Sequence, residues 1–91
     1  MKNIIMERLN CPEDRAMLIE EKLEQLHEDL KPLLHQWLND GTVDEKVLVE
    51  GYSAVYFMRD YEMEFTGAIL TMDWLLREPE VAKAAIEDGY M

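Results

Sequence analysis

Cysteine, serine and glycine are scarce in this sequence, and each shortage weakens the case for a class of function. Cys11 is the only cysteine, so the chain can form no internal disulfide, which fits a reducing compartment. Ser53 is the only serine, and no Gly-x-Ser-x-Gly motif surrounds it. The four glycines form no phosphate-binding loop. The sequence therefore gives no support to a hydrolase, kinase or dehydrogenase, and we expect a protein that is not an enzyme.

Basic residues are also few. The chain has 9 Lys and Arg against 20 Asp and Glu, which gives a formal net charge of −11. Proteins bind DNA, RNA and anionic membranes through Lys and Arg, so we expect no direct contact with nucleic acid or membrane. An acidic surface of this kind either keeps a protein soluble by self-repulsion or binds a basic protein surface.

Long apolar runs are missing as well. No uncharged stretch approaches the roughly 18 residues of a membrane-spanning helix. Residues 1–10 lack the apolar core of a signal peptide, so we expect a cytoplasmic protein. Apolar residues nevertheless make up 48% of the 91 positions, enough for one packed core. The prediction is a single all-helical domain over residues 1–91.

Two segments carry apolar residues at alternating spacings of three and four, which keep one face of an α-helix towards a partner. They predict a helix that starts within residues 10–14 and runs to about Asn39, and a second helix from about Val43 to Arg77. The first series is Ala16, Ile19, Leu23, Leu26, Leu30, Leu33 and Trp37. The second is Val47, Gly51, Ala54, Met58, Tyr61, Phe65, Ala68, Met72 and Leu75.

The ends of the first helix follow from cap and proline chemistry. Either Asn10 or Cys11 is expected to cap it, with Pro12 in the first turn, where proline is tolerated. Pro32 either kinks this helix or makes it stop and restart. The kink is favoured, because the apolar series continues in phase beyond the proline. Gly41 suits the left-handed position that closes a helix.

The second helix is expected to follow almost at once. Thr42 and Glu45 match a capping box, which leaves a link of only about three residues and predicts antiparallel neighbours. Gly51 and Gly67 weaken the second helix. If it splits in two, Thr66–Gly67 is the favoured place.

Shorter elements flank these two helices. Residues 79–86 predict a short third helix with Pro79 in its first turn and Gly89 as its closing residue. Residues 1–9 are either a short helix, which we favour, or extended. The predicted fold is therefore all-α, an antiparallel hairpin of two long helices with a short C-terminal helix. Because two helices leave their flanks uncovered, we expect self-association, a protein partner or a compact fold-back of the short segments, and among these we favour a dimeric helical bundle.

The sequence offers weak candidates for a metal or catalytic site. Glu24 and His27 match the Glu-x-x-His pairing of di-iron helical bundles, but no second copy of the pairing follows. Cys11 lies beside Glu13 and Asp14, whose negative charge opposes a reactive thiolate. We therefore expect no catalytic residue, no metal site and no cofactor.

Surplus apolar and aromatic residues on the second predicted helix indicate a partner-binding surface. A single antiparallel neighbour cannot cover more than one apolar stripe, so part of this helix is expected to bind a protein partner or a second copy of the chain. The candidate residues are Tyr52, Tyr56, Phe57, Met58, Phe65, Met72 and Trp74.

Exposed acidic residues support an alternative function. Acids spaced along a helix by four and seven residues recur every ~6 and ~10.5 Å, on the scale of phosphates along a nucleic-acid strand. The alternative is thus a nucleic-acid mimic that inhibits a basic DNA- or RNA-binding protein, as anti-restriction and anti-CRISPR proteins do. Its candidate residues are Asp14, Glu20, Glu21, Glu24, Glu28, Asp60, Glu62 and Glu64.

Overall fold

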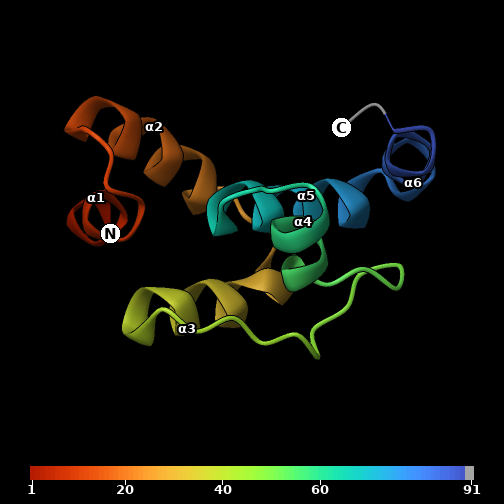
Figure 1. Ribbon diagram of the computed structural model, residues 1–91, viewed down its shortest axis with the longest axis horizontal. Coiled ribbons are helices and arrows are strands. Elements are labelled where there is room, and N and C mark those ends of the chain that lie inside the picture. The colour runs from red at the N-terminus through yellow and green to blue at the C-terminus, as the bar shows by residue number, and fades with distance from the viewer. Residues whose placement is uncertain (90–91) are drawn as a thin grey trace. The chain divides into compact units, whose positions relative to one another are not determined.

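The computed structural model describes residues 1–89. Within this range it contains helices and no β-strand (Figure 1). The helices are α1 (Lys2–Leu9), α2 (Glu13–Glu24), a 3₁₀ helix η1 (Glu28–Leu30), α3 (Lys31–Asp40), α4 (Ala54–Asp60), α5 (Phe65–Arg77) and α6 (Pro79–Glu87). The all-α class is therefore confirmed. Among residues 1–89, no helix is both long enough and apolar enough to cross a membrane.

The chain divides into two compact units. The first, residues 1–43, holds α1, α2, η1 and α3, and the second begins at Asp44 and holds α4, α5 and α6. In the first unit α1 packs against α2, and in the second α4 and α6 both pack against α5. The prediction of a single domain over residues 1–91 stays a prediction.

The predicted hairpin of two long helices is wrong. Residues 43–53, expected to open the second helix, form no helix. Glu50 and Gly51 have φ of 53° and 84°, and the backbones of Val49 and Tyr52 exchange two hydrogen bonds of 2.9 Å. Two successive residues with positive φ make a tight reversal that an α-helix cannot contain. The predicted link of about three residues is wrong for the same reason, and the antiparallel pairing inferred from that link loses its premise.

The predicted capping box is also wrong. The Thr42 hydroxyl donates to Asp40 Oδ1 at 2.5 Å and accepts from the Gln36 amide at 2.7 Å. Its oxygen therefore serves the end of α3, and Glu45 follows in a non-helical segment. The cap of the next helix is Ser53, whose hydroxyl accepts a bond of 3.1 Å from the Tyr56 N–H.

A second interruption separates α4 from α5. Glu62 has φ of 54°, and the Phe57 carbonyl accepts from both Tyr61 and Met63, at 3.1 and 3.4 Å. These bonds are typical of a helix that closes on a left-handed residue. The split therefore falls at residues 61–64, whereas Thr66 and Gly67 lie inside α5, so its predicted place is wrong.

The first predicted helix is likewise broken. α2 ends at Glu24, and Pro32 lies in the first turn of α3, so the favoured kink is wrong and the alternative, a stop and restart, is found. Asn10 does not cap α2 and instead closes α1 with φ of 51°. Pro12 occupies the cap of α2, so the cap predicted at residues 10 or 11 is wrong.

Other predicted features are confirmed. Residues 1–9 contain a short helix, Gly41 closes α3 with φ of 79°, and Gly89 follows α6 with φ of 76°. Most of the first apolar series and part of the second are buried. The buried members are Ala16, Leu23, Leu26, Leu30, Leu33 and Trp37 of the first series, and Ala54, Phe65, Ala68, Met72 and Leu75 of the second.

Candidate functional site

Helix α2 has two apolar faces, and the structure buries only one. Ala16 and Leu23 are buried, and their separation of seven residues places them on one side of the helix. Met17 and Leu18 are 52% and 61% exposed. At about 100° per residue, Met17 lies on the flank of the buried face and Leu18 lies nearly opposite that face.

Two carboxylates border this exposed apolar pair. Asp14 and Glu21 are exposed and lie at the i and i+7 positions of the stripe that Met17 and Leu18 complete. The four residues line an open groove of about 400 Å³. We call these four residues the α2 stripe. They form an apolar centre with negative charge at both ends.

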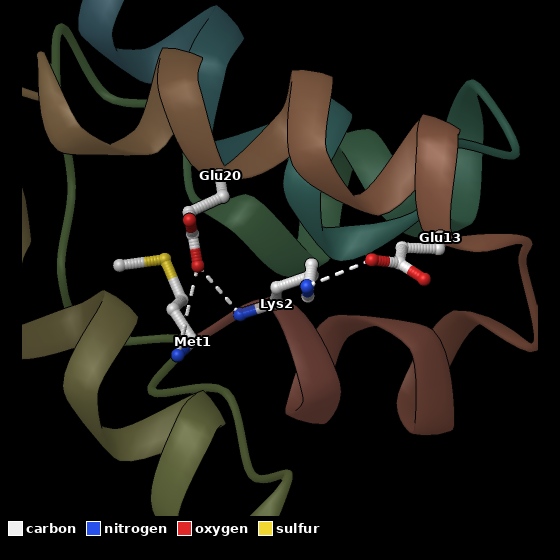
Figure 2. A network of polar contacts seen from close by, with 4 residues as sticks. All are labelled: Met1, Lys2, Glu13 and Glu20. Carbon is white, nitrogen blue, oxygen red and sulfur yellow. Dashed lines mark hydrogen bonds and ion pairs between the residues drawn. The ribbon is translucent and has the colours of Figure 1, made fainter.

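The neighbouring edge of α2 is occupied by α1 (Figure 2). The Glu20 carboxylate accepts a bond of 2.6 Å from the Lys2 backbone N–H and lies 3.6 Å from the Met1 amino group. The Lys2 ammonium donates to Glu13 Oε1 at 2.9 Å. That hydrogen bond is the main reason why the pKa of Lys2 is raised above 10.5. Glu13 and Glu20 therefore fasten α1, and Asp14 and Glu21 are left facing solvent.

A second set of contacts, at the C-terminal end of α1, joins α1 to α3 within the first unit. The Arg8 guanidinium donates to the Leu38 carbonyl at 3.1 Å, near the C-terminal end of α3. It also lies over the Trp37 ring, 5.8 Å from the centroid. A cation at this end of a helix interacts favourably with the helix dipole. α1 is thereby linked to both α2 and α3.

The acidic residues predicted for a mimic are mostly exposed but do not form one row. Glu20 is half-buried against α1, and the other seven are exposed. Asp14, Glu21 and Glu24 lie on α2, whereas Glu28 lies on η1, beyond the end of that helix. Asp60 ends α4, and Glu62 and Glu64 lie in the turn before α5, within the second unit.

Of the seven predicted partner-binding residues, three are buried and four are half-buried. Phe57, Phe65 and Met72 are buried, and Tyr52, Tyr56, Met58 and Trp74 are half-buried. No residue of this set is fully exposed, so any surface that the set offers is limited to the accessible parts of the four half-buried residues. The part of the chain that the structure describes thus places these side chains where they fill space in the second unit.

An aromatic cluster explains why this region is packed. Tyr52, Tyr56, Phe57 and Tyr61 contact one another, with ring centroids 5.3–5.9 Å apart. The Tyr61 hydroxyl donates to the Ile86 carbonyl at 3.2 Å, which ties the α4–α5 turn to α6. A hydrogen bond with Tyr61 is the main cause of the raised pKa of Tyr56.

Glu24 and His27, considered for a metal site, and Cys11, considered as a reactive thiol, lie in different parts of the first unit. Glu24 ends α2, and the His27 Nδ1 accepts the Asp29 N–H at 3.1 Å as the cap of η1. Cys11 is half-buried between α1 and α2. Within residues 1–89, no three His, Cys, Asp or Glu side chains are grouped so that they could hold a metal ion.

Comparisons of the chain with protein-family models, with curated proteins and with solved structures found no match. The sequence patterns predicted a binding surface on the second helix and did not predict the α2 stripe. Its signal was present, because Met17 and Leu18 are apolar residues outside the apolar series of their own helix.

Proposed function

We propose that this chain is a small acidic protein-binding module of the cytoplasm, regulatory in role and without catalytic activity. The observation that carries the proposal is the exposure of Met17 and Leu18 outside the buried face of α2. Single exposed apolar side chains are common, but adjacent ones outside a core face make a surface that gains free energy when a partner covers it.

The half-buried aromatics offer at most a supporting surface. Tyr52, Tyr56, Met58 and Trp74 keep part of their area accessible. Phe57, Phe65 and Met72 are better explained as core, since exposing them to a partner would require the second unit to open. We therefore propose that the main contact with a partner is made by α2 and not by the residues of the second predicted helix.

Co-purification from the native host tests the proposal. The full-length chain, tagged at its C-terminus, is the bait, and each captured protein is then purified and titrated against the chain by calorimetry. We expect one protein to bind saturably with a defined stoichiometry. If no captured protein binds once both components are purified, the chain is not a protein-binding module.

Nucleic-acid mimicry is a second candidate, and the exposure of seven of its eight predicted acidic residues favours it. A mimic's complex should weaken steeply with salt, and duplex DNA or RNA should compete for the partner. Reversing the charges of Glu21, Glu24 and Glu28 to Lys should abolish binding. The control reverses three exposed acids of the second unit: Glu45, Glu80 and Glu87.

The two triple variants and the competition with nucleic acid together distinguish a mimic from other acidic binding proteins. Loss of binding only in the first triple variant, together with competition by nucleic acid, supports a mimic. Equal loss in both variants means that only total charge matters. A complex that nucleic acid does not displace contradicts mimicry, while the broader proposal of a protein-binding module stands.

Self-association is a third version of the proposal. A homodimer was expected because a two-helix hairpin leaves its flanks uncovered, and that premise fails with the hairpin. The dimer stays a prediction, which sedimentation equilibrium at micromolar concentration tests. A monomer throughout that range would leave only a partner of different sequence.

A further inference from the structure

The residues of the α2 stripe point to a particular kind of partner. Asp14, Met17, Leu18 and Glu21 follow the i, i+3, i+4, i+7 pattern by which one helix face contacts another helix. The groove that they line is open to solvent on a helix whose other side is already buried. An occupant therefore approaches α2 from outside its unit and needs an apolar strip of matching length.

The charges at the two ends of the stripe select the occupant further. Asp14 and Glu21 are about 10.5 Å apart along the helix axis, from a rise of 1.5 Å per residue. Both are exposed, and within residues 1–89 neither forms an ion pair. A partner with Lys or Arg at a similar separation would place a cation at each end while its apolar residues cover Met17 and Leu18.

A second copy of the chain fits this surface poorly. Two antiparallel α2 helices paired through the stripe would bring Asp14 of each copy to Glu21 of the other. Each copy also carries a net charge of −11. Like charges set opposite one another disfavour such a complex. Charge complementarity thus favours a basic partner over self-association at this face.

We propose that the α2 stripe binds a basic amphipathic helix of another protein. Apolar side chains of that helix pack on Met17 and Leu18, and its Lys or Arg side chains pair with Asp14 and Glu21. Because the apolar contacts are buried and the ion pairs lie at the rim, the apolar pair supplies most of the affinity and the acids supply orientation. This inference rests on the proposed protein-binding function and gives it a site and a partner class.

A synthetic peptide is the probe for a direct test. It is an amphipathic helix of Leu, Lys and Ala, about three heptads long, with Leu at one face and Lys beside it. The control peptide has the same composition in an order that forms no apolar face. Fluorescence anisotropy of labelled peptide against the full-length chain measures the dissociation constant at low and at high salt.

Apolar variants test the centre of the stripe. M17E/L18E should raise the dissociation constant by about tenfold or more. Both side chains are largely exposed, so the fold should persist, and circular dichroism checks this. L48E/V81E is the matched control, because it also adds two carboxylates, and Leu48 and Val81 are 59% and 56% exposed in the second unit. It should leave the constant unchanged.

Charge variants test the ends of the stripe. D14N/E21Q and D60N/E62Q each remove two exposed carboxylates, so they change the net charge equally. The first pair should weaken binding several-fold more than the second at low salt, and this difference should shrink at high salt. The amide replacements keep shape and helix propensity close to the originals.

Three outcomes would overturn the inference. The first is that neither peptide binds, or that the scrambled peptide binds as well as the amphipathic one. The second is that L48E/V81E or D60N/E62Q weakens binding as much as its counterpart on α2. The third is a wild-type dimer that M17E/L18E dissociates, since the occupant would then be a second copy of the chain.

Binding of the purified native partner to the wild type and to M17E/L18E distinguishes failure of this inference from failure of the proposed function. If the purified partner binds M17E/L18E as tightly as the wild type, the site is wrong and the protein-binding function stands. If the M17E/L18E variant loses both the partner and the peptide, site and function are supported together. If no partner exists while the amphipathic peptide still binds at the stripe, the proposed function is the part that fails.

Discussion

At the scale of single residues, left-handed backbone positions close several of the helices of this chain and reverse the chain before α4. Asn10, Glu50 and Glu62 have φ between 51° and 54°, and each lies where a helical segment closes or the chain reverses. Such a conformation costs roughly 1–2 kcal/mol for a residue with a side chain. Glu50 and Glu62 were not recognisable from sequence as turn residues, because glutamate is not a usual occupant of this region.

Two glycines allow a matched test of this backbone argument. Gly51 has φ of 84°, so G51A should lower the free energy of unfolding by about 1 kcal/mol. Gly67 is helical, and a Cβ there would lie 3.8 Å from the Met63 Cβ, an ordinary contact. G67A should therefore raise the free energy of unfolding by about 0.5–1 kcal/mol. Urea denaturation measures both, and shifts of the same sign would contradict the assignment of these two positions.

Asp40 supplies a test of pH dependence at the same scale. Its carboxylate accepts bonds from the Thr42 hydroxyl and, at 2.9 Å, from the Thr42 N–H, and these lower its pKa below 3.8. A carboxyl whose pKa is lowered by folding stabilises the fold above its unfolded pKa, and this is lost as pH falls through the folded value. D40N keeps an acceptor oxygen but loses the charge.

The wild type should therefore be more stable than D40N at pH 7, and the difference should narrow as the pH falls from about 5 to 2. Chemical denaturation at each pH measures the free energy of unfolding of both proteins, and so the difference between them. E87Q, which changes an exposed carboxyl on α6, is the control and should track the wild type more closely. A gap between wild type and D40N that stays constant over this range would contradict the assigned role of the Asp40 charge.

At the scale of elements, the sequence predicted which helix faces are buried better than it predicted how long each helix is. The spacing of apolar residues is a local property, so Leu23, Leu33 and Trp37 are buried even though the helix expected to join them is broken. The breaks depend on turn geometry near Gln25, Glu50 and Glu62, which that spacing does not report. The same limit explains why the proposed α2 stripe was not predicted, because a second helix expected to be long concentrated the predicted surface on its aromatic residues.

Arg8 tests how the elements of the first unit are joined. R8M keeps an unbranched apolar stem but removes the cation over Trp37 and the bond to the Leu38 carbonyl. It should lower the free energy of unfolding by about 0.5–1 kcal/mol, since Arg8 is exposed. The fluorescence of Trp37 should shift as well, and W74F provides a background in which Trp37 is the only tryptophan. Unchanged stability and emission would remove Arg8 from the contacts that join α1 to α3.

At the scale of the whole molecule, the open question is the thermodynamic coupling of the two units. Each unit has its own helices, and each has one tryptophan, Trp37 in the first and Trp74 in the second. A chain of 91 residues is small for two independent cores, because small domains bury little of their unfolded surface. This favours the prediction of a single cooperative domain, in which damage to either unit destabilises both.

A core substitution read from the opposite unit tests that prediction. Met72 is buried in α5, so M72A should cost about 2–5 kcal/mol, enough to lower the melting temperature by roughly 10 °C or more. In a W74F background, fluorescence reports only Trp37, in the other unit. One cooperative domain requires the Trp37 transition to fall by the same amount as the Trp74 transition measured in a W37F background. If the Trp37 transition stays in place while the Trp74 transition falls, the chain folds as two domains, and the binding proposed at α2 would stabilise the first alone.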